Sequence, residues 1–358
     1  MKDSWKYFDK FTFLVLLIIT VFGIIMIYSA SFTTDKTYFT KQIAWFVISL
    51  ICFFLIFRIK TETIFRWRWT LFVGLLFCLI ILLLAGIITS GVRSWFRIGF
   101  MSIQCSEFIK IPLALIIAKI MAKTRWITLK PFLRIIAVIS IPFVLIMLQP
   151  DLGTAFILGA YFLMLVLLKR IKFIILLTTI IVMIGGSFLA WNYVLKPYQK
   201  NRLISFINPE KYSKSTGYQS IQSKIAIGSG GLVGEGYLKG SQSQYKFLPT
   251  RHTDFVVSVL GEELGFMGVS LLFFLFFILF YRQFNIKTQT DEEFYFVYLF
   301  NGLILFQFAI NVLMSIGFMP ILGIPLPFIS YGGSSLLGFF MGEAIIFKIK
   351  INSYINEF

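Results

Sequence analysis

The chain has 358 residues, of which 58% are hydrophobic and 18% aromatic, and its formal net charge is +17. The mean hydropathy of +0.87 excludes an ordinary soluble protein, because that much apolar surface would aggregate in water. Runs of about 20 apolar residues match the thickness of the hydrocarbon core of a bilayer. The sequence therefore predicts an all-α integral membrane protein, since backbone in lipid must satisfy its own hydrogen bonds.

Taken in chain order, the apolar runs predict ten transmembrane helices in a single polytopic domain, residues 1–358. The first run follows Lys6 and Lys10, but its apolar core is too long for a signal peptide, so we expect it to remain uncleaved. A polar stretch, residues 193–253, predicts one large outer loop between the seventh and eighth spans. The predicted spans lie near 11–30, 42–57, 69–89, 106–122, 132–149, 153–168, 172–192, 254–281, 294–314 and 333–347.

The basic residues are divided unevenly between the two sides of this topology. Nineteen, including Lys2, lie on the side of the chain ends, against four in the short loops opposite. This positive-inside pattern predicts that both termini are cytoplasmic, so the net charge reflects topology rather than nucleic-acid binding. The outer loop carries nine further basic residues, for which two explanations remain open: contact with anionic lipid headgroups, or binding of an anionic substrate.

Cysteine and histidine are too few to predict a disulfide framework or a metal site. Cys52 and Cys78 fall within predicted spans, which leaves Cys105 alone near the outer face. His252 is the single histidine, and no sequence pattern of a zinc site is present. We therefore expect no metal ligands among the site residues, and no cofactor is evident.

Asp254 stands where the long outer loop meets the eighth span. A carboxylate at a membrane edge can reach both water and a lipid-borne substrate, and partial desolvation can tune its pKa. Asp254 is therefore the first candidate for a catalytic residue.

Other ionisable residues fall inside or beside the predicted spans, where charges are costly and are functional candidates by default. Glu107 and Lys110 are three residues apart on one helix face, where they can pair; they either pack two helices together or line a polar cavity. Asp151 precedes the sixth span, where an aspartate caps the helix or contributes to the site.

Two carboxylates follow Asp254 on the same predicted helix. Glu262 is eight residues after Asp254 and shares its face, whereas Glu263 points about 100° away. Asp254 and Glu262 could serve as an acid and base pair, or Glu262 could simply bond a neighbouring span.

Irregular stretches accompany these charges. The glycine-rich run at 227–236 is a tight turn or, less in keeping with its sequence, a phosphate cradle. Residues 317–335, which include Ser330, are apolar but interrupted by three prolines, so we expect them to line a site rather than to span as a straight helix.

These motifs, in this order, resemble the shape, elongation, division and sporulation (SEDS) family of bacterial membrane glycosyltransferases, and its elongation branch more than its division branch. Cys105 departs from the usual proline of the family and Thr250 from a common acidic residue, which affects fine geometry and leaves the aspartate in place. The segments that carry the resemblance are 27–31, 94–99, 103–110, 149–154, 222–231, 240–244, 251–255 and 325–333.

The resemblance implies a peptidoglycan glycosyltransferase of the bacterial plasma membrane. Such an enzyme polymerises lipid II, an undecaprenyl-diphosphate-linked disaccharide-peptide, on the outer face during elongation and so controls rod shape. It implies that Asp254 is catalytic, that Glu107 and Lys110 support activity, and that the partners are a class B penicillin-binding protein and other elongation proteins.

We expect Asp254 to deprotonate the acceptor hydroxyl. Arg202, Lys224, Arg251 and Lys110 are candidates for stabilising the diphosphate, and a divalent cation (Mg or Mn) could share that task. The substrate cavity is expected to include Glu107, Lys110, Asp151, Glu262 and Ser330. The alternatives are a flippase for lipid-linked precursors and a non-catalytic scaffold.

Overall fold

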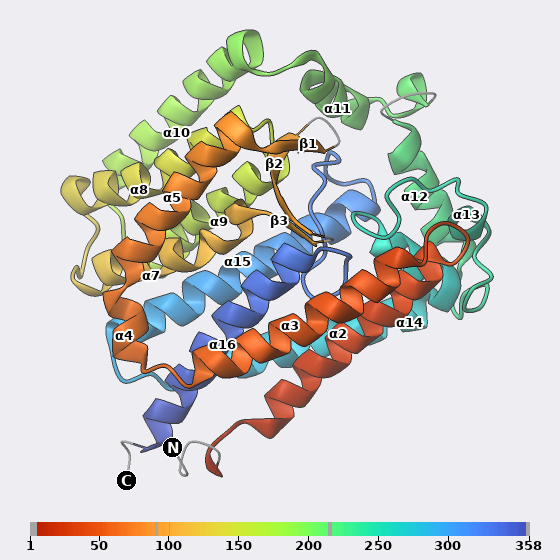
Figure 1. The fold of residues 1–358 in the computed structure, drawn as a ribbon. Coiled ribbons are helices and arrows are strands. Elements are labelled where there is room, and N and C mark those ends of the chain that lie inside the picture. Colours follow the sequence, from red (N-terminus) through yellow and green to blue (C-terminus); the bar gives the residue numbers. More distant parts are fainter. Residues whose placement is uncertain (1–5, 90–91, 100, 214–216, 356–358) are drawn as a thin grey trace.

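The computed structural model describes residues 6–89, 92–99, 101–213 and 217–355, which form a bundle of long helices (Figure 1). Lys2 and residues 214–216 of the predicted outer loop lie outside the described residues. The helices are α2 (Lys10–Ser31), α3 (Thr37–Phe57), α4 (Thr61–Arg66), α5 (Arg68–Ala85), α6 (Cys105–Phe108), α7 (Lys110–Ala122), α8 (Leu129–Leu148), α9 (Leu152–Leu168), α10 (Phe173–Leu189), α11 (Pro197–Ile207), α12 (Tyr218–Ser229), α13 (Ser241–Gln244), α14 (Val256–Phe284), α15 (Asp291–Ser315) and α16 (Gly333–Ile355). Shorter elements are the π-helix Ala190–Val194, the 3₁₀ helix Glu210–Tyr212 and the strands β1 (Ile87–Thr89), β2 (Val92–Ile98) and β3 (Met101–Ile103).

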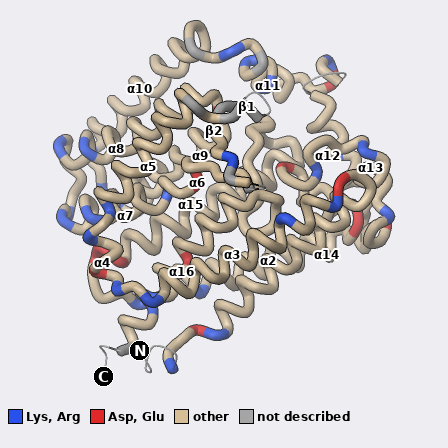
Figure 2. Tube along the Cα trace, viewed as in Figure 1, with Lys and Arg blue, Asp and Glu red and all other residues tan. Residues whose placement is uncertain are grey.

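The two ends of the bundle differ in content. Both chain ends lie at one end, while α11, α12 and α13 lie at the other (Figure 1). Figure 2 shows lysines and arginines gathered around the chain ends and at the ends of α7 and α8. We call the end with the chain termini the basic face and the opposite end the loop face. The basic face is the one that the charge pattern predicts to be cytoplasmic.

The predicted fold class, an all-α integral membrane protein, is confirmed. Six of the described helices are long and apolar enough to cross a membrane, and α5 and α9 are shorter apolar helices. In the part of the chain described, the one sheet is a small antiparallel one with the order β1-β2-β3. Every predicted span overlaps at least one helix.

The predicted span 69–89 extends too far at its C-terminal end. The helix α5 ends at Ala85, and Gly86 is extended with φ −70° and ψ 148°. Residues 87–89 form β1, in which Ile87 faces Trp95 of β2. Strand pairing therefore satisfies backbone groups that a continued helix would have bonded within itself.

The predicted span 106–122 is divided into α6 and α7 at Ile109. Pro112 lies in the first turn of α7, and it has no N–H with which to bond the carbonyl of Phe108. The division places Glu107 in α6 and Lys110 at the first position of α7.

Helix α15 occupies the centre of the bundle, where it packs against α7, α9 and α14. Its buried face includes three amide side chains, Asn301, Gln307 and Asn311, each at most 1% exposed. At the periphery, α10 has one buried residue, Ile175. An apolar helix with so little protein contact faces lipid over most of its surface.

Helix α14 is interrupted at Gly265, which has φ +64° and ψ −163°. The glycine-rich run of the outer loop lies in this break and bonds both sides of it, so a turn of the loop replaces the missing turn of the helix. The four backbone bonds are Glu235 N to Glu262 O (2.9 Å), Gly236 N to Glu263 O (3.0 Å), Phe266 N to Gly231 O (2.9 Å) and Met267 N to Leu232 O (3.0 Å).

The close approach of the two backbones explains the glycines. A Cβ at Gly230 would lie 1.9 Å from the carbonyl oxygen of Gly261, and one at Gly234 would lie 2.2 Å from that of Glu263. A Cβ at Gly265 would lie 2.4 Å from the backbone nitrogen of Gly234. The run is therefore a turn fitted to α14. We call residues 231–236 the splint.

We expect Gly265→Ala to lower the free energy of unfolding by about 1–3 kcal/mol, because the backbone conformation of Gly265 is accessible essentially to glycine alone. Gly185→Ala in α10 is the control, since no atom lies within 4 Å of a Cβ at that position. Thermal unfolding in detergent should show a lowered midpoint for the first variant only. Equal midpoints would contradict the close contact between the splint and α14.

Candidate active site

Asp254 lies in the turn that leads into α14. Its backbone N–H donates to Thr250 O at 3.0 Å, and its carbonyl accepts from Asn311 Nδ2 of α15 at 2.9 Å. The next residue, Phe255, is fully buried and anchors the turn to the bundle. The backbone of Asp254 is therefore held on both sides of its Cα.

Burial raises the pKa of the Asp254 carboxyl to about 6. The hydroxyl groups of Thr253 and Thr250 and the charge of Arg202 act in the opposite direction and lower this pKa. Asp254 is consequently ionised at neutral pH and yet a stronger base than an ordinary aspartate, which suits it to accept a proton.

Three charged side chains lie along the irregular segment between Gly317 and Gly323. Lys224 of α12 approaches Gly317, where a built Cβ would lie 2.9 Å from its Nζ. Arg202 of α11 donates to Ile321 O at 3.4 Å. A Cβ at Gly323 would lie 3.7 Å from Asp254 Oδ2. One segment thus brings two cations and the carboxylate to the loop face.

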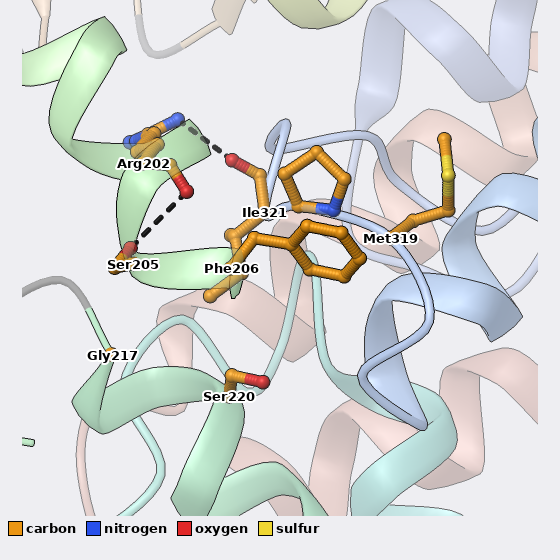
Figure 3. Close-up of a pocket in the computed structure, with 8 residues that line it drawn as sticks. Arg202, Ser205, Phe206, Gly217, Ser220, Met319 and Ile321 are labelled. Carbon is orange, nitrogen blue, oxygen red and sulfur yellow. Dashed lines mark hydrogen bonds between the residues drawn. The ribbon is translucent and has the colours of Figure 1, made fainter. Parts of the chain in front are cut away.

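A shallow depression, with room for about one water molecule, lies beside this segment. Its lining includes Arg202, Ser205 and Phe206 of α11, and Met319 and Ile321 of the segment (Figure 3). The guanidinium group of Arg202 lies at its edge and is only partly buried. The depression therefore has a cation at its edge.

The position of Lys224 is set by its neighbour in α12. Ser223 Oγ lies 2.6 Å from Ser258 Oγ of α14 and donates to Ser315 O, the end of α15, at 2.5 Å. Ser223 is fully buried, whereas Lys224 is exposed. Ser223 therefore holds α12 against α14 and α15, and the next residue, Lys224, projects toward the site.

Glu107 and Lys110 form the predicted pair. Lys110 Nζ donates to Glu107 Oε2 at 2.8 Å and to Gln307 Oε1 of α15 at 3.2 Å. Both members are buried, at 6% and 2% exposed, so the pairing prediction is confirmed and the pair packs helices together. Lining of a substrate cavity remains a prediction for these two residues.

Helix α15 connects this pair to the loop face. Gln307 Nε2 donates to Pro325 O at 2.9 Å, and Asn311 Nδ2 donates to Ile324 O at 2.7 Å. These two residues are one helical turn apart, and the sequence analysis did not select either of them. Their spacing of four in an apolar helix was the available signal, because polar side chains on one face of a span seek a partner inside the protein.

Asp151 caps α9, as its position before that helix predicts. It accepts from Thr154 N at 3.0 Å and from Thr154 Oγ1 at 2.8 Å, and Gln104 Nε2 donates to it at 2.8 Å. Burial raises the pKa of Asp151, and the charges of Glu107 and Lys110 act on the same pKa in opposite directions. Asp151 therefore belongs to the surroundings of the buried pair.

Glu262 and Glu263 bind α13 and α2. Glu262 accepts from the backbone nitrogens of Gln242 at 2.5 Å and Ser243 at 3.0 Å. Glu263 accepts from Ser29 Oγ of α2, at 2.5 and 2.7 Å to its two oxygens. The structure thus gives Glu262 the bonding role, and the acid and base pair with Asp254 has no support from its contacts.

Arg251 and Ser330 also have contacts that hold the structure together. Arg251 donates to Ala30 O at the end of α2 and to Thr33 Oγ1 at 3.2 Å, and it is 4% exposed. Ser330 Oγ accepts from Leu326 N at 2.9 Å. A role in diphosphate binding remains a prediction for Arg251, whose guanidinium group is occupied by α2.

His252, the residue after Arg251, contributes an aromatic contact. His252 stacks on Tyr38 with ring centroids 4.0 Å apart, and its carbonyl accepts from Tyr331 N at 2.9 Å. Burial and the charge of Arg251 lower the pKa of His252 to about 4. The imidazole is therefore neutral at pH 7. Among the residues that the structure describes, no group of three or more His, Cys, Asp or Glu side chains could hold a metal ion.

Comparison with known proteins identifies the family. The model of the cell cycle protein family FTSW_RODA_SPOVE matches residues 9–355. The chain belongs to this family. It is 32% identical to the peptidoglycan glycosyltransferase MrdB of Escherichia coli K12 over 97% of this chain and 95% of that protein. It is also 32% identical to the peptidoglycan glycosyltransferase RodA of Treponema pallidum over 96% of this chain and 97% of that protein.

Solved structures share the fold. One chain comes from a study of structural coordination of polymerization and crosslinking by a peptidoglycan synthase complex; it has a TM-score of 0.84 and 26% identity, over 97% of this chain and 98% of that chain. The crystal structure of the rod shape determining protein RodA of Thermus thermophilus has a TM-score of 0.70 at 24% identity, over the same shares of the two chains. The SEDS resemblance read from the motifs is confirmed.

We expect Glu107→Gln and Lys110→Met each to destabilise the protein by about 3–5 kcal/mol, because each leaves one buried charge without its partner. The double variant should lose less than the sum of the two single losses. Thermal or denaturant unfolding of the four proteins provides the double-mutant cycle. Additive losses would show that the two side chains do not interact in solution.

Proposed function

We propose that this chain is a peptidoglycan glycosyltransferase that polymerises lipid II into glycan strands at the loop face of the bacterial plasma membrane during elongation. Its membership of the family and its similarity to the MrdB and RodA proteins support this activity. The site is assigned from the position of Asp254, whose pKa is raised. Asp254 lies at one end of the segment between Gly317 and Gly323, which also contacts Arg202 and Lys224.

Asp254 acts as the general base in this proposal. The oxygen of the acceptor 4-hydroxyl forms a bond to the anomeric carbon of the donor sugar, and its proton passes to the Asp254 carboxylate. The bond between that carbon and the diphosphate breaks, and the lipid diphosphate leaves with the electron pair. Attack in line with the leaving group inverts the anomeric carbon.

The departing diphosphate gains negative charge, which Arg202 and Lys224 are placed to stabilise. Arg202 borders the depression and Lys224 is exposed beside Gly317. Among the described residues, no group of three or more His, Cys, Asp or Glu side chains fits a divalent cation, so the side chains named above carry the steps of this proposal.

A flippase would need charged or polar groups along a path through the whole bilayer. Here Asp254, Arg202 and Lys224 gather at one face, and the buried Glu107–Lys110 pair is closed upon itself and Gln307. A scaffold that only positions a partner gives no reason for a carboxylate whose pKa lies near 6. Both alternatives are therefore less well supported than the transferase.

The proposed partner is a class B penicillin-binding protein, a transpeptidase that crosslinks the strands, together with other elongation proteins. The similarity to a chain studied in a synthase complex that coordinates polymerization and crosslinking supports such a pairing. The activity should therefore be measured on the complex.

We expect Asp254→Ala and Asp254→Asn to lower glycan polymerisation by about 10²–10⁴-fold, the usual contribution of a positioned general base. The measurement is the ladder of polymers that the chain and its transpeptidase form from labelled lipid II on a gel. The control is Glu210→Ala, which removes an exposed carboxylate elsewhere in the outer loop. Near-normal ladders from folded, partner-bound Asp254 variants would exclude the base assignment, and lipid transport would then be tested by a flipping assay.

The rate should rise with pH, with its midpoint at about pH 6 and a plateau at higher pH, because the base must be ionised and burial raises the pKa of Asp254 to about 6. The charge of Arg202 lowers this pKa, so Arg202→Met should shift the midpoint to a higher pH. Initial rates of both proteins across the pH range provide the measurement. An unchanged midpoint in the variant would show that the titrating group is not under the influence of Arg202.

A further inference from the structure

Two polar side chains meet inside the bundle, well away from Asp254. Gln283 lies near the end of α14 toward the basic face, and Glu343 lies in the middle of α16. Gln283 Nε2 donates a hydrogen bond to Glu343 Oε2. Gln283 is 1% exposed and Glu343 is fully buried. The contact joins two helices whose N-terminal ends lie on the loop face.

Each of the two groups retains a buried oxygen without a donor. Glu343 Oε1 and Gln283 Oε1 are both inaccessible and make no hydrogen bond to the described residues. Both atoms are acceptors when the carboxyl group is ionised, so neither can satisfy the other. An ionised Glu343 would leave a buried charge and two unsatisfied acceptors, each of which costs free energy.

The surrounding charges do not compensate Glu343. In the part of the chain that the structure describes, no salt bridge includes this residue. Arg282 and Lys350 both bind Asp9, and Lys348 Nζ lies 5.4 Å from the ring centroid of Phe57. Other charged groups lie toward the basic face on helices that pack against α14 or α16: Lys10 in α2, Glu62 and Arg66 in α4, Lys119 in α7, and Asp291, Glu292 and Glu293 in α15.

We propose that Glu343 binds a proton and forms a cyclic acid–amide pair with Gln283. The proton, taken up from water, forms a bond to Glu343 Oε1, and this O–H donates to Gln283 Oε1. The observed bond from Gln283 Nε2 to Glu343 Oε2 closes the ring. One proton thereby satisfies both orphaned oxygens and removes the buried charge. The site is a proton-binding site that fastens α14 to α16.

Glu343→Gln tests the proposal, because an amide carries the donor permanently and can form the same two bonds with Gln283. We expect this variant to polymerise glycan like the wild type. Infrared difference spectra at neutral pH should show the C=O band of a protonated carboxylic acid in the wild type and its loss in the variant. The matched control is Glu293→Gln, since Glu293 is also buried but accepts from Gln289 N at 2.9 Å, and it should leave that band in place.

Thermal stability provides the second readout. The stabilities of the wild type and Glu343→Gln should differ least at about pH 4, near the pKa of an ordinary glutamate, and only the wild type should lose stability relative to the variant as the pH rises from there to about 9, because the unfolded chain is then ionised while the folded chain keeps the proton. Gln283→Leu should lower the midpoint even at about pH 6, because it leaves the acid without a partner.

Three results would overturn the proposal. The first is an unchanged carboxylic acid band in Glu343→Gln. The second is a constant difference in stability between that variant and the wild type across the pH range. The third is stabilisation of the wild type, but not of the variant, by sodium or potassium ions, which would assign the buried oxygens to a cation instead of a proton.

Discussion

The site depends on side-chain amide groups that donate hydrogen bonds to the carbonyl groups of non-helical backbone inside the membrane protein. Residues between α15 and α16 cannot bond within a helix, so their carbonyl groups need donors from elsewhere. Gln307 and Asn311 supply these donors to Pro325 and Ile324, and Asn311 also holds the carbonyl of Asp254. Because Gln307 also accepts from Lys110, the buried ion pair and the turn of Asp254 are fixed by one face of α15.

The charged side chains near the site fall into two groups. Some are buried and hold helices together, and others remain accessible at the loop face. Arg251, Glu262 and Glu263 are all buried, and each bonds another element: the first joins α2, and the two glutamates join α13 and α2. Asp254 and Arg202 are partly accessible, and Lys224 is exposed. A transferase needs both kinds, because a base is effective only where its surroundings hold it in place.

Hydropathy predicted the helical fold and the approximate spans, since the bilayer imposes both composition and length. The sequence also predicted that Asp254 lies at the start of α14 and that Asp151 caps α9, because both features depend on neighbouring residues in the chain. The end of α5 at Ala85 and the role of the glycine run depend on pairing with other segments of the chain, whereas the break at Ile109 accompanies the local Pro112. A single sequence does not specify such contacts, which is also why Gln307 and Asn311 escaped selection.

The bonds between the splint and α14 restrict insertions and deletions in this part of the outer loop. Outer loops are ordinarily the places where insertions and deletions are tolerated. Residues 231–236 are different, because they bond four backbone groups of α14, two before and two after Gly265. Deleting them would leave those groups unsatisfied next to hydrocarbon, so a shortened gene product would fail in the helix rather than in the loop. Length variation in this protein is therefore expected elsewhere in the loop, between α11 and α12.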